Sequence, residues 1–238
     1  MHRLLRFSLV LCPTILFNWT TLYYISQKSS FVIYAAMLLL EIVTLITLVM
    51  TSVMDPGYIP RRNFIKAIKT DKSESTIEDQ AAPFFNQYVY DKGRIVKMKY
   101  WYTWEIYRPQ RSSHWGNWDA CIEKIDHHWP WLGTWIGKRN YKFFFIFVNW
   151  LSFMVFLGIF LSTIEIILRV SDKKAEGLNT NEAMKESLKI SPYPIIFIAL
   201  SIISSLFVVV LCLYHHKLAW ISSTTYEELK GITIQFYK

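Results

Sequence analysis

Residues 101–135 read WYTWEIYRPQRSSHWGNWDACIEKIDHHWPWLGTW, and the spacing within this stretch determines what kind of domain it can form. The three-residue interval of a CxxC pair separates Trp101 from Trp104, Trp115 from Trp118, and Trp118 from Cys121. Zinc sites use this interval because two ligands that are three residues apart on a tight turn can reach one ion. Tryptophan offers one N–H donor, no lone pair for a metal and no nucleophile. The residue type therefore contradicts the pattern.

Long apolar blocks flank this stretch and indicate a membrane protein. Hydrophobic residues make up 53% of the 238-residue chain and gather in four blocks, at approximately residues 7–25, 31–50, 143–168 and 195–213. A transmembrane helix needs about 20 residues, so each block is close to spanning length. A cleaved signal peptide is the alternative for the first block, but its length and the lack of a small-residue cleavage site argue against it. We expect four transmembrane helices.

The distribution of charge predicts the orientation of the chain. The net charge is +8, and Lys and Arg are concentrated before the first block and between the second and third blocks. Cytosolic segments of membrane proteins show this excess, so we expect both termini and the middle segment in the cytosol and a loop at residues 169–189 on the other side. The basic surface suits anionic headgroups or a phosphate-bearing substrate. Its position beside membrane spans argues against a nucleic-acid partner.

The segment between the second and third blocks is predicted to contain a linker and a small ordered module. Turn residues Asp55-Pro56-Gly57 end the second block, residues 64–90 are mostly polar, and order is expected to resume near Lys97. The module extends to about Arg139 and shows little helical or strand periodicity. Domains of this size usually need a metal or disulfides, and a cytosolic location argues against disulfides. Zinc is the metal that the ligand spacing predicts.

Short motifs occur along the chain in a characteristic order. They are Asp55-Pro56-Gly57, Arg108-Pro109, Arg111-Ser112-Ser113-His114, Asp126-His127-His128, Pro130-Trp131, Gly137-Lys138-Arg139-Asn140-Tyr141 and Thr224-Thr225-Tyr226-Glu227. With these motifs and the four apolar blocks, nearly the whole chain resembles the DHHC family of protein S-acyltransferases (palmitoyltransferases). The resemblance implies transfer of a fatty acyl group from acyl-CoA to cysteines of membrane-associated proteins.

The resemblance also implies roles for individual residues. The nucleophile is the family's cysteine at the position of Trp129, His127 is the base that activates the thiol, and Asp126 orients that histidine. This assignment is chemically consistent because an adjacent imidazole lowers the pKa of a thiol. Two zinc ions are implied, with ligand positions Trp101, Trp104, His114 and Cys121 for the first and Trp115, Trp118, His128 and Trp135 for the second. Five of these eight positions, and position 129, are tryptophan where the family has cysteine.

The expected fold is an all-α integral membrane protein with four transmembrane helices and a small cytosolic zinc-binding module between helices 2 and 3. The expected segments are residues 1–54 (helices 1 and 2), 55–98 (cytosolic linker), 99–141 (zinc module), 142–216 (helices 3 and 4) and 217–238 (cytosolic tail). The expected location is an endomembrane (Golgi or ER) or the plasma membrane. The expected partners are the lipid bilayer, acyl-CoA and membrane-associated protein substrates.

Two explanations account for the six tryptophans. If they are real, Trp129 cannot be acylated, both zinc sites are incomplete, and the protein is a catalytically dead pseudoenzyme or a membrane scaffold. Overfilling a packed site typically costs roughly 1–3 kcal/mol, and it would have to be tolerated repeatedly. If they are misread, a gene in which UGA encodes Cys has been translated with a table that reads UGA as Trp. We favour misreading, because one cause then explains six substitutions.

A third interpretation treats the tryptophans as a membrane-interface anchor. Seven of the ten tryptophans lie between residues 101 and 135, beside a membrane and among basic residues. Tryptophan is enriched at membrane interfaces. An anchor explains neither the metal-ligand spacing nor the adjacent pair His127 and His128, so it is the weakest of the three interpretations.

The codons at positions 101, 104, 115, 118, 129 and 135 distinguish the first two explanations. We expect UGA at all six positions, and UGU or UGC at Cys121. Trp131 is the internal control: the family also has tryptophan there, so its codon should be UGG. Sequencing the transcript reads these codons directly, and UGG at the six positions would overturn the misreading hypothesis.

Overall fold

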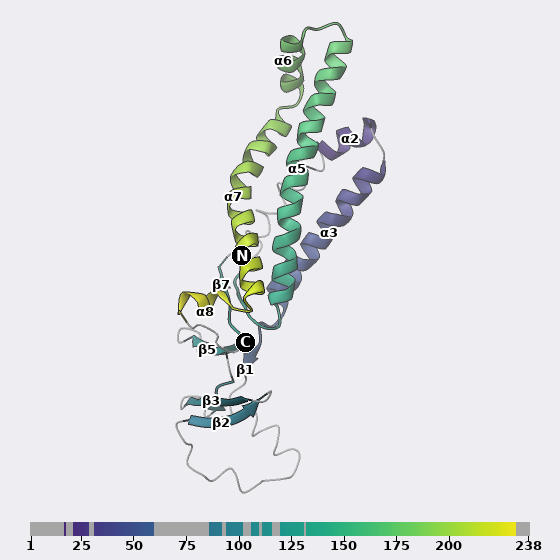
Figure 1. The fold of residues 1–238 in the computed structure, drawn as a ribbon. Helices are drawn as coiled ribbons and strands as arrows, with labels where there is room; N and C mark the ends of the chain where they lie inside the picture. Colours follow the sequence, from purple (N-terminus) through teal and green to yellow (C-terminus); the bar gives the residue numbers. More distant parts are fainter. Residues whose placement is uncertain are drawn as a thin grey trace. The chain divides into compact units, whose positions relative to one another are not determined.

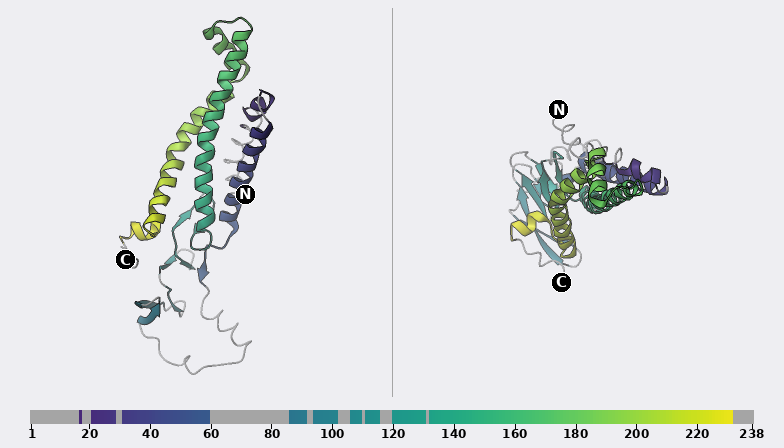
Figure 2. Two further views of the ribbon diagram at one scale, coloured as in Figure 1. Left: turned by 45° about the vertical axis from the view of Figure 1, so that its right-hand side comes forward. Right: turned by 90° about the horizontal axis from the view of Figure 1, so that it is seen from above.

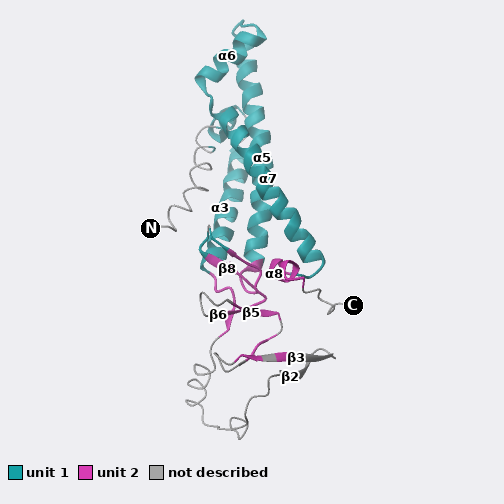
Figure 3. Ribbon diagram, turned by 90° about the vertical axis from the view of Figure 1, so that its left-hand side faces the viewer, with its two compact units in different colours: residues 1–53, 129–133, 142–223 teal, residues 54–128, 134–141, 224–238 magenta. Residues whose placement is uncertain are grey.

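The computed structural model describes residues 17, 21–28, 31–59, 86–91, 94–101, 106–109, 111–115, 120–130 and 132–231. The chain divides into two compact units, each assembled from separate segments (Figure 3). Unit 1 comprises residues 1–53, 129–133 and 142–223, and unit 2 comprises residues 54–128, 134–141 and 224–238. Unit 1 contains the long helices, whereas the short strands belong mainly to unit 2.

Unit 1 is helical. Its described helices are α2 (Tyr23–Lys28), α3 (Phe31–Val53), α5 (Tyr141–Ala175), α6 (Thr180–Ile190) and α7 (Tyr193–Trp220). Helices α3, α5 and α7 are each long and apolar enough to cross a membrane, and α5 lies between the other two (Figures 1 and 2). These three helices correspond to the second, third and fourth apolar blocks. The first expected span, residues 7–25, lies mostly outside the described residues.

Aromatic and aliphatic side chains form the core of unit 1. A buried cluster contains Phe17, Leu22, Ile25, Met37 and Leu161. Phe197 of α7 stacks on Phe17 with ring centroids 4.6 Å apart. Many outward-facing side chains of α7 are also large and apolar, including Ile202, Leu206, Phe207 and Val210. Apolar residues on both faces of a long helix are expected where lipid replaces water as the solvent.

A polar network links α2 to α5. Glu165 is fully buried and accepts a 2.8 Å hydrogen bond from Arg169, one turn along the helix. The Arg169 guanidinium lies 3.8 Å from the centroid of the Tyr24 ring. The Tyr24 hydroxyl donates to Asp172 at 2.8 Å, and Lys28 pairs with the same carboxylate at 2.9 Å. Buried charges need such partners, so this network fixes the α2 segment against α5.

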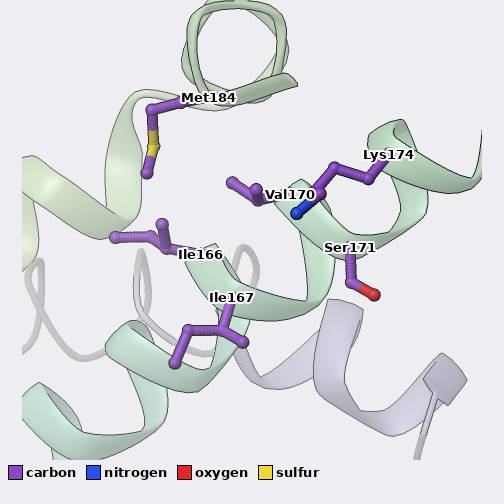
Figure 4. A pocket seen from close by; sticks show the side chains of 6 residues that line it. All are labelled: Ile166, Ile167, Val170, Ser171, Lys174 and Met184. Atoms are coloured by element: carbon purple, nitrogen blue, oxygen red, sulfur yellow. The ribbon is translucent and has the colours of Figure 1, made fainter. Parts of the chain in front are cut away.

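The segment expected to connect the third and fourth spans, residues 169–189, contains the end of α5 and most of α6. Asn179 begins α6 with a capping box, in which its side chain accepts from the Glu182 N–H at 3.0 Å and the Glu182 carboxylate accepts from the Asn179 N–H. Such a box satisfies N–H groups that a helix end leaves unpaired. A cavity of about 360 Å³ lies beside α5 and α6 and is lined by Ile166, Ile167, Val170, Ser171, Lys174 and Met184 (Figure 4).

The module in unit 2 is built from short antiparallel strands, so the all-α expectation was wrong for this part of the chain. Its strands are β1 (Tyr58–Ile59), β2 (Asn86–Asp91), β3 (Arg94–Trp101), β4 (Ile106–Tyr107), β5 (Ser112–Trp115), β6 (Ala120–Glu123), β7 (His127–Trp129) and β8 (Thr134–Ile136). They form sheets of order β1-β6-β5, β2-β3-β4 and β7-β8. Most of these strands have only two to four residues, which is too short for alternation to be visible in the sequence.

The hairpin formed by β2 and β3 shows that order begins earlier than expected. Asn86 pairs with Lys99, and the register continues through Val89 opposite Val96 to Asp91 opposite Arg94. Order was predicted to resume only near Lys97. Aromatic and β-branched residues favour strands, and Tyr88, Val89 and Tyr90 are of this kind, but polar and charged residues flank this short run on both sides. The rest of the expected linker, residues 60–85, lies outside the described residues.

A close backbone approach brings two of the sequence motifs together in unit 2. Asp55 accepts hydrogen bonds from the N–H groups of Gly57 and Tyr58, each at 3.0 Å, which closes the turn after α3. A Cβ at Gly137 would lie 2.5 Å from the Pro56 carbonyl oxygen and 2.8 Å from Ile122 Cγ2. Glycine is therefore required at 137 because the backbone of another segment occupies the space of a side chain.

Gly137→Ala should destabilise the protein by roughly 1–3 kcal/mol, because the added methyl group meets backbone that cannot rotate away. Gly158→Ala is the matched control. A Cβ at Gly158 would meet mainly the Phe197 ring, 2.9 Å away, and a side chain can move. The apparent melting temperature in detergent measures both variants. We expect a clear decrease for Gly137→Ala and a smaller change for Gly158→Ala; equal melting temperatures for Gly137→Ala and the parent would contradict this account.

Candidate active site

The buried carboxylate of Asp126 is the centre of the site in unit 2. Its side chain is inaccessible to solvent, and its Oδ2 lies 2.6 Å from His127 Nδ1. Thr225 donates its backbone N–H to Oδ1 at 3.0 Å and its hydroxyl to Oδ2 at 2.8 Å. Because a carboxylate only accepts, the proton of this pair lies on Nδ1, and Nε2 is the basic nitrogen of the neutral ring. Asp126 thus fixes both the orientation and the tautomer of His127.

The pKa of Asp126 reflects a competition between burial and hydrogen bonding. Burial alone raises the pKa of a carboxyl group, because it disfavours the charged form. The hydrogen bond and charge of His127 and the two donors of Thr225 outweigh burial and hold the pKa of Asp126 below its usual range. The group is therefore a carboxylate at neutral pH, as a residue that orients an imidazole must be.

The expected nucleophile position, Trp129, ends β7 and belongs to unit 1. Its indole packs edge-on against Phe144, with ring centroids 5.2 Å apart, and lies 6.0 Å from the ring of Phe147. Both phenylalanines are buried on α5. Position 129 therefore faces an apolar aromatic surface. The indole itself has no atom that can attack a thioester.

The positions of the first expected zinc site converge in the structure. His114 and Cys121 are cross-strand partners in the hairpin of β5 and β6, and His114 Nδ1 lies 3.6 Å from Cys121 Sγ. The ring of Trp101 lies 4.4 Å from the His114 ring. Three of the four expected positions are thus neighbours, and the fourth, Trp104, lies outside the described residues.

The second expected zinc site is described only in part. His128 on β7 and Trp135 on β8 have ring centroids 4.7 Å apart. Trp115 is described by its backbone alone, and Trp118 lies outside the described residues. The two positions whose side chains can be compared are therefore adjacent, as ligands of one ion would be.

The residues as written do not fit zinc. A structural zinc site needs four donors in a tetrahedron, but at the first site only His114 and Cys121 have donor atoms of the required kind. The indole N–H of Trp101 is buried and finds no acceptor within the described part of the chain. Leaving a buried donor unsatisfied costs about 1–3 kcal/mol. The spacing and the convergence suit a metal, whereas the tryptophan side chains do not.

Thr225 belongs to the candidate site through its two hydrogen bonds to Asp126, and the sequence did not predict this contact. Its motif, Thr224-Thr225-Tyr226-Glu227, was recognised, but nothing in the sequence predicts contact with Asp126, which is 99 residues away. The motif begins the short helix α8 (Thr225–Leu229). Tyr226 packs on the buried cluster of Ile122, Ile125 and Trp135, which fixes α8 to the module. The only signal available from the sequence was the motif itself.

Comparisons with known proteins show which family this chain resembles in sequence. The family model for DHHC palmitoyltransferases matches residues 95–232. Palmitoyltransferase ZDHHC9 from Danio rerio is 31% identical over 198 residues, which cover 81% of this chain and 49% of that protein. Palmitoyltransferase ZDHHC14 from Homo sapiens is 35% identical over 191 residues, which cover 78% of this chain and 37% of that protein. Palmitoyltransferase ZDHHC18 from Homo sapiens is 30% identical, with coverages of 95% and 57%. The chain thus spans 37–57% of the length of these three relatives.

Replacing Asp126 with Asn should change the pH dependence of stability. Because the folded-state pKa of Asp126 is lowered, its contribution to stability is complete above the unfolded pKa of about 3.9 and is lost as the pH falls further. We expect the parent to be more stable than Asp126→Asn at pH 7 and the difference to narrow below about pH 4. Apparent melting temperatures of the chain as written and of its Asp126→Asn variant, measured from pH 7 down to pH 3, test this. A difference that stays constant with pH would contradict the assignment.

Proposed function

Because this chain belongs to the DHHC palmitoyltransferase family, we propose that its gene encodes a protein-cysteine S-palmitoyltransferase with cysteine at positions 101, 104, 115, 118, 129 and 135. The enzyme transfers a fatty acyl group from acyl-CoA to cysteines of membrane-associated proteins. One observation supports this most strongly: the buried carboxylate of Asp126 orients His127, which is two residues before position 129 in the sequence. A histidine held in this way is the base that a cysteine nucleophile needs.

The proposed reaction has two steps. In the first, His127 Nε2 takes the thiol proton at position 129, the thiolate attacks the thioester carbonyl of acyl-CoA, and an acyl–sulfur bond forms as the bond to the CoA sulfur breaks. The CoA thiolate leaves and takes the proton back from His127. In the second, His127 Nε2 takes the thiol proton of a substrate cysteine, and the resulting thiolate attacks the new thioester. An acyl–sulfur bond to the substrate forms as the bond to the sulfur at position 129 breaks, and the thiolate at position 129 takes the proton back from His127. Asp126 stabilises the imidazolium form of His127 in both steps.

The surroundings of position 129 favour an acyl substrate. Phe144 and Phe147 present buried aromatic surface beside this position in unit 1. We propose that the helices of unit 1 accommodate the acyl chain among their apolar side chains. The cytosolic Lys and Arg residues attract the phosphates of CoA, because a basic surface raises the local concentration of an anionic ligand.

The encoded protein is further proposed to have four transmembrane helices, with residues 7–25 as the first, and a cytosolic module at residues 99–141 that contains two zinc ions. With cysteines restored, each zinc site has four ligands, and the convergence of Trp101, His114 and Cys121 supports the first of them. The zinc ions are structural, because they replace the apolar core that a module of this size lacks. We place both termini in the cytosol and the protein in an endomembrane or the plasma membrane.

The alternative is a catalytically dead pseudoenzyme or membrane scaffold with real tryptophans. The packing of Trp129 against Phe144 and Phe147 favours it, because the two aromatic rings provide a surface that accommodates an indole. The buried N–H of Trp101 argues against it, since no acceptor for that group lies among the described residues.

Restoring all six cysteines should give both zinc binding and auto-acylation. We expect about two zinc ions per purified chain and a hydroxylamine-sensitive label at position 129 after incubation with labelled acyl-CoA. The chain as written should show neither. Trp129→Cys alone should also fail, because the zinc sites remain incomplete.

A five-cysteine variant that keeps Trp129 separates the two activities. It should bind zinc like the six-cysteine chain and take up no label, because only the nucleophile is missing. If the six-cysteine chain binds zinc but is not labelled by acyl-CoA, the proposed enzymatic function is wrong.

A further inference from the structure

A buried ion pair connects the C-terminal motif to the module of unit 2. Arg111 donates from Nε to Glu227 Oε1 at 2.6 Å and from a terminal nitrogen to Oε2 at 2.7 Å. The two side chains are only 13% and 7% exposed. A second pair in the same unit, Lys138 with Glu123, is 49% and 29% exposed. Burying two charges costs free energy unless the geometry of the pair is excellent. The bidentate contact between Arg111 and Glu227 therefore differs from an ordinary exposed ion pair, and its burial requires an explanation.

The backbone at Arg111 is held in an unusual conformation. Its φ angle is +60°, in the left-handed region that costs a non-glycine residue roughly 1–2 kcal/mol. The turn is closed by Ser112, whose N–H and hydroxyl donate to the Pro109 carbonyl at 3.2 and 2.6 Å, and the Arg111 carbonyl accepts from the Lys124 N–H at 3.0 Å. Strained backbone of this kind persists where surrounding contacts fix it. Strand β5, which contains His114, begins at the next residue.

Glu227 has a second set of contacts that positions Thr225. Its Oε2 accepts the N–H of Thr224 at 2.9 Å, and its own N–H donates to the Thr224 hydroxyl at 3.3 Å. These two bonds form the capping box that begins α8. The first residue of that helix is Thr225, which donates twice to Asp126. The carboxylate that Arg111 binds therefore also sets where the donors to Asp126 lie.

We propose that Arg111 is a positioning residue for acyl transfer: through Glu227 and Thr225 it holds Asp126, and therefore the ring of His127, in the orientation that the reaction requires. The inference rests on the proposed function, since it assigns His127 as the base. It links the hairpin of β5 and β6, where His114 and Cys121 are paired, to the catalytic carboxylate. Arg111 itself touches none of the reacting atoms.

A positioning role for the ion pair can be distinguished from the role of simply attaching α8 to the module. Tyr226 already packs α8 on Ile122, Ile125 and Trp135, so the helix has an anchor that does not depend on Arg111. Loss of the ion pair should therefore leave α8 docked but displace the two donors of Thr225. A displacement of this kind lowers the rate of the chemical step more than it affects substrate binding.

The kinetic test uses the six-cysteine chain and matched glutamate variants. We expect Glu227→Gln and Arg111→Met each to lower the auto-acylation rate at saturating acyl-CoA by about 10- to 100-fold, with KM changed less than about threefold. Arg111→Lys should recover part of the rate, because it keeps the charge. Glu123→Gln, which removes the charge of the exposed pair, should keep the parent rate. Parent-like rates for both Glu227→Gln and Arg111→Met would overturn the proposal.

A double-mutant cycle tests whether Arg111 acts through Thr225. If it does, Arg111→Met should have little further effect in a Thr225→Val background, because the contact with Asp126 is already weakened. Residues that act through one network are non-additive, whereas independent residues give additive changes. Additive losses would show that Arg111 does not act through Thr225, and would overturn the proposal.

Hydrogen exchange of the Thr225 amide tests the coupling without any activity. This N–H donates to Asp126, so it should be protected, and Arg111→Met should raise its exchange rate at least about tenfold in the chain as written, whereas Glu123→Gln should not. Unchanged exchange in Arg111→Met would overturn the positioning role. A six-cysteine chain that is never labelled, together with accelerated exchange in Arg111→Met, would reject the proposed enzyme and leave the coupling of Arg111 to Thr225 supported.

Discussion

Hydrogen bonds converge on the Asp126 carboxylate from parts of the chain that are distant in sequence, and the organisation of the site depends on them. His127 lies beside it at 2.6 Å, and Thr225 reaches it from the C-terminal motif with two donors. A buried carboxylate without such partners would take up a proton and lose its hold on the imidazole. Glu227 and Arg111 in turn fix the residues that supply these donors.

The sequence predicted the features that repeat or match a motif. Apolar blocks predicted α3, α5 and α7, which the structure confirms. The family resemblance grouped Trp101, His114 and Cys121 as ligand positions, and the three residues are neighbours in the structure. The strands of unit 2 were missed, because most are too short for an alternating pattern. The contact of Thr225 with Asp126 was missed because partners 99 residues apart leave no periodic signal. Both failures concern tertiary context rather than local preference.

The tryptophans at ligand positions remain the main conflict between residue type and fold. Among the described residues, Trp101 lies beside His114 and Trp135 lies beside His128, as zinc ligands would. The buried indole N–H of Trp101 has no acceptor in the described chain. Around Trp129, by contrast, Phe144 and Phe147 form an apolar environment that accommodates an indole. A thiol beside the same aromatic surface would be well placed to receive a fatty acyl group. One misread codon accounts for all of these positions together.

The central claim is that the protein in its own organism has cysteine where this sequence shows tryptophan. Mass spectrometry of the peptide that contains His127 and position 129, prepared from protein isolated from that organism, tests the claim most directly. Our account predicts a peptide mass and fragment series with cysteine, or acylated cysteine, at position 129. A fragment series with tryptophan at that position would contradict it and would establish the protein as a pseudoenzyme.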